Sequence, residues 1–145
     1  MSPTGKNEFF VLDKLPELEL SPQQYIIVGS GVMDALGIRR ANDVDFVAPP
    51  EVFDGLAERG WNKAEDSPSL VKGSFEVYLA WDSNNGEPNF EDLMSTRQVI
   101  EQYTFVKLDR LLDWKKRVAR PKDLKDVELI ETYLTADRRD GTETK

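Results

Sequence analysis

The 145-residue sequence contains no histidine and no cysteine. Without cysteine the chain has no disulfide, no thiolate metal site and no thiol nucleophile. Without histidine it has no imidazole base, no Ser-His-Asp triad and no histidine-ligated zinc. Any chemistry must therefore depend on carboxylates, lysines, arginines and hydroxyls.

Long hydrophobic runs are also absent. No apolar stretch approaches the roughly 18 to 20 residues needed to cross a bilayer, which excludes a membrane span. Residues 1–8 are polar and lack the hydrophobic stretch of a secretory signal, so we expect a cytoplasmic protein. Basic residues are in the minority, and the net charge of −8 argues against bulk nucleic-acid binding because it repels polyanions.

What the chain does contain is typical of one globular domain. Hydrophobic residues make up 39% and charged residues 32%, which is enough apolar surface for an ordinary core. The length is close to the usual size of a single domain. We therefore predict one domain over residues 1–145, with its core at about 22–134 and loosely ordered termini.

Local patterns predict a chain in which strands and helices are mixed and two helices come last. Predicted strands cover 25–28, 43–47 and 75–81, and residues 70–74 are predicted to be a strand followed by a turn. Predicted helices cover 32–36, 50–59, 108–118 and 121 to about 134. We expect residues 9–20 to be a short helix or an irregular segment, residues 84–88 to be a loop and residues 90–94 to be a helical turn. Residues 99–106 are ambiguous, and a final strand is one interpretation of them, whereas residues 136–145 are expected to be a frayed tail. The expected fold class is α+β, with a small mixed sheet flanked by helices.

The most informative stretch begins where the first predicted strand ends. Val28-Gly29-Ser30 leads into a predicted helix, and a glycine there lets phosphates approach the backbone. Ser30 adds a hydroxyl, and the N–H groups of the first helical turn point the same way. A triphosphate would fit this turn, although glycine and serine after a strand are more often only a turn.

Twelve residues later comes Asp43-Val44-Asp45. Residues i and i+2 of a strand project from the same face, so Asp43 and Asp45 are expected to lie together. Two neighbouring carboxylates repel each other unless a cation lies between them, and oxygen ligands favour Mg²⁺ or Mn²⁺. A phosphate cradle beside a metal site is typical of phosphoryl or nucleotidyl transfer. The alternative is an ordinary solvated strand face.

These residues resemble the signature of the DNA polymerase β-like nucleotidyltransferase superfamily. That signature consists of a hydrophobic residue, a glycine, a second position that is glycine or serine, a spacer, and an acidic–hydrophobic–acidic triplet. Residues 37–45 are similar to the "LGIRRTxDID" segment of its small bacterial members. Downstream, Lys115 and residues 120–126 resemble the "K…RPKDLxD" segment of the bacterial toxin-type branch, the AbiEii-like and related families. The resemblance implies a nucleotidyltransferase fold.

The resemblance also implies roles for residues outside the first motif. It implies a third acidic metal ligand on a neighbouring strand, for which Glu76 is the better match and Asp82 the alternative. Strands of this class more often carry Asp at that position. Lys115 would lie at the nucleotide phosphates, and Asp123 would orient Lys115 or the acceptor. Asp123 also suits a structural role as a carboxylate in the first turn of the last helix.

The resulting hypothesis is a metal-dependent nucleotidyltransferase that moves a nucleoside monophosphate from an NTP, such as ATP, to a hydroxyl. Asp43, Asp45 and Glu76 would hold Mg²⁺ or Mn²⁺, Gly29, Ser30 and Lys115 would bind the nucleotide, and Asp123 would complete the set. Arg39 and Arg40 are placed where they can contact phosphates.

The acceptor stays open among an RNA end, a protein hydroxyl and a small aminoglycoside-like molecule. The toxin-type resemblance adds an antitoxin or a homodimer as a partner. Residues 115–125 contain six basic side chains and one acid, which favours RNA, whereas the net charge of −8 disfavours it. The alternative functions are a catalytically inactive domain that binds a nucleotide or a protein, and a plain structural α+β domain.

Overall fold

Residues 12–82 and 87–143 are described by the computed structural model, except for the side chains of Asp13, Asp82, Glu87 and 137–143. The chain divides into two compact units, residues 1–107 and 108–145. The first unit carries the Gly-Ser turn and the Asp43/Asp45 pair, and the second carries Lys115 and Asp123.

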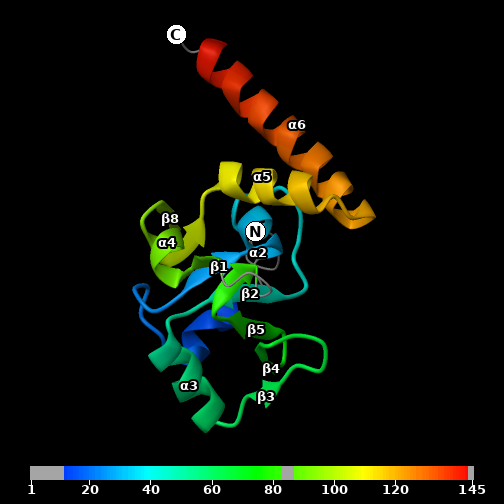
Figure 1. The fold of residues 1–145 in the computed structure, drawn as a ribbon. Coiled ribbons are helices and arrows are strands. Elements are labelled where there is room, and N and C mark those ends of the chain that lie inside the picture. Colours follow the sequence, from blue (N-terminus) through cyan, green and yellow to red (C-terminus); the bar gives the residue numbers. More distant parts are fainter. Residues whose placement is uncertain (1–11, 83–86, 144–145) are drawn as a thin grey trace. The chain divides into compact units, whose positions relative to one another are not determined.

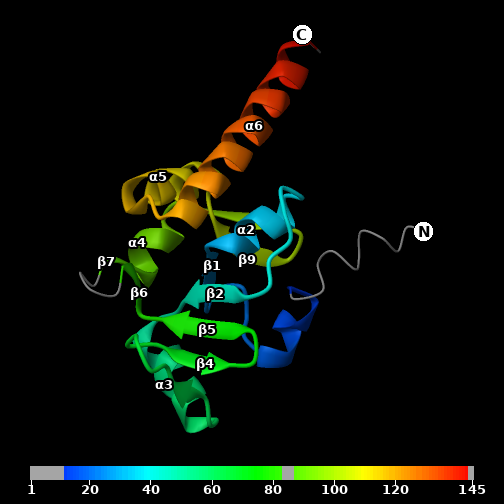
Figure 2. The same cartoon turned by 90° about the vertical axis from the view of Figure 1, so that its right-hand side faces the viewer.

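A seven-stranded mixed sheet with the order β3-β4-β5-β2-β1-β9-β8 forms the centre of the first unit. Its strands are β1 (Ile26–Val28), β2 (Val44–Val47), β3 (Asn62–Lys63), β4 (Leu70–Lys72), β5 (Phe75–Tyr78), β8 (Arg97–Ile100) and β9 (Tyr103–Val106). Strand β2 pairs antiparallel with β1 and parallel with β5, and Figure 2 shows β2, β5 and β4 side by side. The predicted mixed α+β class is confirmed.

The helices of the first unit are short. They are η1 (Leu12–Leu18), a 3₁₀ helix, α2 (Ser30–Ala35), α3 (Pro50–Glu58) and α4 (Phe90–Met94). Helix α3 begins with Pro50, whose fixed φ suits a first helical position, and Gly60 follows its end with φ +98°. Asn89 and Asp92 form a capping box at the start of α4.

Part of the core of this unit lies on the sheet face that carries Val44 and Phe46, both fully buried. Tyr25 and Trp61 pack edge-to-face against the Phe46 ring, with ring centroids 6.2 Å apart in both pairs. Because strand side chains alternate between faces, Asp45 projects from the opposite face of β2. The face of β2 that carries Val44 and Phe46 therefore anchors the strand, and the other face presents the carboxylate beside the buried Val47.

The predicted strand 75–81 is divided in the structure. Strand β5 ends at Tyr78, and β6 (Ala80–Asp82) pairs instead with β7 (Glu87–Asn89) in a separate two-stranded sheet. Tyr78 is the register partner of Val47, the last residue of β2, so β5 has no β2 partner beyond it. The predicted loop 84–88 is therefore wrong at Glu87 and Pro88, and its residues 84–86 lie outside the described residues.

The ambiguous region 99–106 is a hairpin of two strands, β8 and β9. Its turn contains Glu101 with φ +60°, a conformation that glycine or asparagine usually adopts. Because neither residue is present at this turn, the local sequence does not indicate a hairpin. The hydrogen-bonded pairing of β9 with β1 extends the sheet on that side.

The second unit consists of α5 (Leu108–Val118) and α6 (Pro121–Glu143), which are yellow and orange to red in Figure 1. Ala119, with φ +55°, forms the tight connection, and Pro121 begins α6. Helix α6 continues to Glu143, so the prediction of a frayed tail from residue 136 is wrong as far as Glu143. That segment is polar but contains no proline, and a polar helix is stable when its charged neighbours are compatible.

None of the helices in the described part of the chain has the length and apolar character that a membrane span requires.

Candidate functional site

The turn after β1 brings the two halves of the first motif together. Gly29 adopts φ +75°, a left-handed conformation that disfavours every residue with a Cβ. A Cβ placed on Gly29 would lie 3.6 Å from Asp45 Oδ2, which is ordinary van der Waals contact. The backbone conformation, and not a shortage of space, therefore requires glycine here. The open side of the turn faces the Asp45 carboxylate.

Sheet register places a second acid beside Asp45. In the parallel ladder of β2 and β5 the partner of Asp45 is Glu76, and in the antiparallel ladder of β1 and β2 it is Val28. Neighbouring strands lie about 4.8 Å apart and register partners point to the same face. Asp45 and Glu76 are half-buried, and Asp43, which precedes β2, is exposed. The structure therefore brings Asp45 and Glu76 to adjacent positions on one face, with Asp43 two residues before Asp45.

Glu76 has a polar partner that the sequence analysis missed. The buried Ser69 hydroxyl donates a hydrogen bond to Glu76 Oε2 over 2.5 Å and lies 3.0 Å from Ser67 Oγ. A serine just before a strand gave no signal of this role. The alternative acid, Asp82, belongs by its backbone to β6 in the separate sheet, and its side chain lies outside the described residues.

The carboxylates suit a hard cation in chemistry, since all three are oxygen donors and Mg²⁺ and Mn²⁺ prefer oxygen. Their arrangement does not form a complete set of metal ligands. Among the side chains that the structure describes, no three acids are grouped as metal ligands are. Asp45 and Glu76 thus provide two neighbouring donors, and the three-carboxylate site stays a prediction.

Ser30, the other residue of the predicted cradle, contacts an arginine. Arg39 Nη2 donates to Ser30 Oγ over 2.9 Å, and Arg39 Nη1 donates to the carbonyl of Arg40 over 2.9 Å. Arg39 and Arg40 line a cavity of about 440 Å³ together with Asp34 and Gly37. The glycine–serine turn therefore has a carboxylate near Gly29 and a guanidinium bonded to Ser30.

Lys115 and Asp123 lie together within the second unit. The Lys115 ammonium is 3.4 Å from Asp123 Oδ1 and 3.0 Å from Asp126 Oδ2, and all three side chains are buried. Asp126 was not predicted as a site residue, although its i, i+3 spacing from Asp123 places both on one face of α6. The ammonium is also 5.9 Å from the Trp114 ring centroid. Lys115 thus links α5 to α6 through two carboxylates.

Asp123 also binds the residue before its helix. Its Oδ2 accepts hydrogen bonds from the Arg120 backbone N–H, over 3.2 Å, and from Arg120 Nε, over 2.5 Å. Burial alone raises the pKa of Asp123, but the hydrogen bonds from Arg120 and the charges of Lys115 and Arg120 outweigh it and lower that pKa below its usual value. Asp123 is therefore ionised at neutral pH, and it satisfies an N–H at the start of α6.

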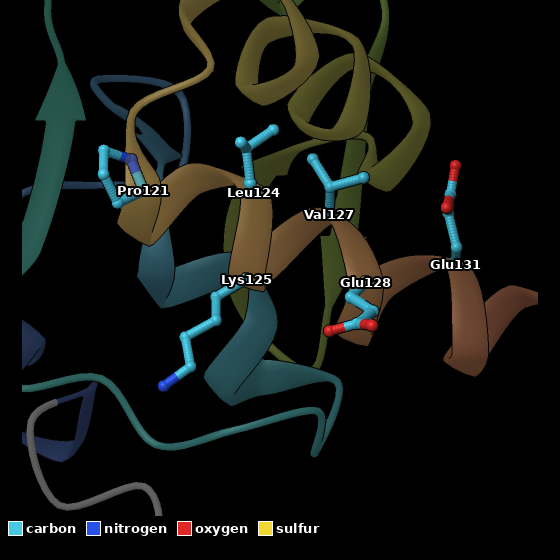
Figure 3. Close-up of a pocket in the computed structure, with 6 residues that line it drawn as sticks. All are labelled: Pro121, Leu124, Lys125, Val127, Glu128 and Glu131. Atoms are coloured by element: carbon cyan, nitrogen blue, oxygen red, sulfur yellow. The ribbon is translucent and has the colours of Figure 1, made fainter.

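A second cavity, of about 450 Å³, lies along α6 alone and is shown in Figure 3. Leu124 and Val127 project to one side of the helix, and Lys125 and Glu128 project to the other. This groove combines exposed apolar side chains with scattered charges of both signs. It has no convergent polar groups of the kind that orient a substrate.

Comparison of the chain with protein-family models, curated proteins and solved structures gives no significant match.

Proposed function

We propose that the protein is a metal-dependent nucleotidyltransferase that transfers a nucleoside monophosphate from an NTP to a hydroxyl. The proposal depends on one observation: a Cβ on Gly29 would lie 3.6 Å from Asp45 Oδ2, so the Asp45 carboxylate lies beside the turn. A turn without a side chain admits polyphosphate, and the neighbouring acid is positioned for the reacting phosphate.

In the proposed reaction the acceptor oxygen forms a bond to the α-phosphorus, and the bond from that phosphorus to the oxygen bridging the β-phosphate breaks. Pyrophosphate leaves, and the hydroxyl proton passes to a carboxylate. That carboxylate would be Asp45 or Glu76, which are register partners on one face of the sheet. Asp43, Asp45 and Glu76 would hold Mg²⁺ or Mn²⁺, which when bound neutralises phosphate charge and lowers the pKa of the acceptor hydroxyl.

The proposal retains the roles that the family resemblance implies for Lys115 and Asp123. The resemblance implies that Lys115 neutralises charge on a phosphate and that Asp123 orients its ammonium, and both residues belong to the second unit. The 3.4 Å separation between Lys115 Nζ and Asp123 Oδ1 is compatible with the orienting role. A phosphate oxygen would have to replace one of the two carboxylate partners of Lys115.

The charges of residues 115–125 bear on the acceptor. Four of the six basic side chains there form ion pairs: Lys115 with Asp123 and Asp126, Lys116 with Glu131, Arg117 with Asp113, and Arg120 with Asp123. This pairing weakens the argument for RNA as the acceptor. The net charge of −8 favours a cationic small molecule with a free hydroxyl, such as an aminoglycoside. The other candidates to be tested are an RNA end or a protein hydroxyl as the acceptor, and an antitoxin as a partner.

A second candidate is a catalytically inactive domain that binds a nucleotide or a protein. The observation that favours it is the absence, among the described side chains, of three acids grouped as metal ligands. Such a domain would keep the glycine–serine turn and would bind nucleotide without transferring any part of it.

The test is incubation of the full chain with α-labelled NTPs, Mg²⁺, and an aminoglycoside, total RNA or a protein extract in turn. We expect label in one acceptor, and loss of that label in Asp45→Ala. Asp54→Ala, which removes an exposed acid from α3, is the matched control and should transfer normally. Transfer that persists in Asp45→Ala contradicts the proposal. Nucleotide binding without transfer to any acceptor supports the second candidate.

A further inference from the structure

The two edges of the seven-stranded sheet differ in length and in polarity. At one edge lies β3, which consists of Asn62 and Lys63, both exposed. A short edge strand that carries a lysine resists pairing with another chain. At the other edge lies the four-residue strand β8, which Figure 1 shows at the margin of the first unit. Within the described part of the chain no strand pairs with the outer side of β8.

The backbone of β8 can accept a further strand. In the antiparallel hairpin with β9, Val99 is the register partner of Thr104, and Ile100 is the register partner of Tyr103. Successive residues of an antiparallel pair direct their N–H and C=O groups alternately toward the partner strand and away from it. Every second residue of β8 therefore directs these groups to the outer side, where they form a template for strand pairing.

The side chains of this edge form a self-complementary pattern. Arg97 and Val99 are exposed and project from one face of β8, and the exposed Glu101 follows in the turn. Val99 is 58% exposed, the largest fraction among the large apolar side chains that the structure describes. A cation thus lies two residues before this apolar side chain, and a carboxylate lies two residues after it. Such a pattern is complementary to its own copy in the antiparallel orientation.

We infer that β8 is a dimerisation edge, at which it pairs antiparallel with β8 of a second copy of this chain. A twofold axis at Val99 places this side chain opposite its own counterpart and places Arg97 opposite the second copy's Glu101. The symmetry forms this ion pair twice. Apolar and opposite-charge pairs at directly opposed positions stabilise antiparallel strands. The two sheets join into one continuous sheet with the two β8 strands at its centre.

The charges favour this register and this occupant. A pairing centred on Gln98 would place Arg97 opposite the second copy's Val99 and would leave no pair between Arg97 and Glu101. A second copy supplies both charges in the required order, which an unrelated strand does not. Arg97 Nη1 donates to the Met94 carbonyl over 2.8 Å, which holds the guanidinium beside the start of β8. A guanidinium has five N–H donors, so others are left for a carboxylate.

Sedimentation equilibrium of the full chain, over a series of protein concentrations at low ionic strength, tests the dimer. We expect the wild type to show a monomer–dimer equilibrium. Arg97→Glu turns both ion pairs into repulsive pairs and should raise the dimer Kd at least roughly tenfold. Glu101→Arg should have the same effect. The double variant, Arg97→Glu with Glu101→Arg, exchanges the charges and should return the Kd to within about threefold of the wild type.

Two further variants complete the test. Lys63→Glu reverses the same charge at the β3 edge and should change the Kd less than about twofold. Val99→Lys places two like charges opposite each other at the centre of the interface and should abolish the dimer. Circular dichroism shows whether each variant is folded, and the restored dimer of the double variant excludes unfolding as the cause of the single-variant losses.

Three outcomes would overturn the inference: a wild type that is monomeric throughout the series, equal weakening by Arg97→Glu and Lys63→Glu, or a double variant that stays as weak as the single ones. The inference does not depend on the proposed function, because β8 and its turn contain none of the proposed site residues. Sedimentation is measured without nucleotide, so a failed dimer leaves the nucleotidyl-transfer assay unaffected. Absence of transfer likewise leaves the dimer measurement valid.

Discussion

In the first unit, Asp45 of β2 and Glu76 of β5 are register partners, and both are half-buried. In the second unit, Asp123 and Asp126 are almost fully buried against Lys115. The two pairs have the same chemistry and opposite surroundings. The Glu76 carboxylate accepts from the neutral Ser69 hydroxyl, but Asp123 contacts the side chains of Lys115 and Arg120.

The difference follows from the cost of burying charge. A buried carboxylate must be compensated by a cation and by hydrogen bonds, or it destabilises the fold by several kcal/mol. Half-buried carboxylates keep part of their hydration, so burial costs them less and they need less compensation. The second unit therefore uses its acids to join two helices. The first unit leaves Asp45 and Glu76 partly exposed to solvent.

The largest expected effect is on the buried ion pairs. Lys115→Met leaves Asp123 and Asp126 without their shared ammonium, and we expect it to lower the free energy of unfolding by about 3 to 5 kcal/mol. Urea unfolding followed by circular dichroism measures this loss. Lys116→Met breaks only the half-exposed pair with Glu131 and should cost less than about 1 kcal/mol. Equal effects of the two substitutions would show that burial does not distinguish them.

The next effect is on activity in the first unit. Asp45→Asn removes one of two neighbouring acids, so we expect at least a hundredfold loss of nucleotidyl transfer, typical of removing a general base. Stability should change by no more than about 0.5 kcal/mol, because Asp45 is only half-buried and one of two neighbouring like charges is removed. A radiolabel assay and a urea titration on the same sample measure both. A large loss of stability would show that Asp45, like Asp123, stabilises the fold, and would contradict this prediction.

Acid should separate the two pairs as well. The pKa of Asp123 is lowered in the folded state, so its contribution to stability is present above its usual value of 3.8 and is lost as pH falls through the folded pKa. Asp123→Asn should be less stable than the wild type at pH 7, and the difference should shrink below pH 4. Urea midpoints between pH 7 and pH 2.5 measure this. A difference that is constant with pH argues against the charge of Asp123 as the cause.

The smallest effect concerns the support of Glu76. Ser69→Ala removes the hydroxyl that donates to Glu76 Oε2, and the expected cost is about 1 kcal/mol, the usual net value of one hydrogen bond. Ser74→Ala removes an exposed hydroxyl from the turn before β5 and should change stability by less than about 0.5 kcal/mol. Thermal unfolding of both variants tests the difference. Indistinguishable melting temperatures would mean that water replaces Ser69 at Glu76.

Local patterns in the sequence were sufficient for the single elements of the fold. The apolar run before Gly29 predicted β1, Pro50 and Gly60 bounded α3, and helical spacing of leucines predicted α5, because each of these signals is a property of a few adjacent residues. The same alternation placed Val44 and Phe46 in the core and Asp45 on the other face. The sequence by itself thus determined which side chains β2 offers.

Only the tertiary structure decided what lies beside them. Parallel pairing of β5 with β2 makes Glu76 the register partner of Asp45, and the end of β2 at Val47 sends Asp82 into a separate sheet. The contact of Ser69 with Glu76 arises from the folding of β4 against β5. Strand pairing and register depend on residues far apart in the chain and on how their faces pack together, and no local pattern records them.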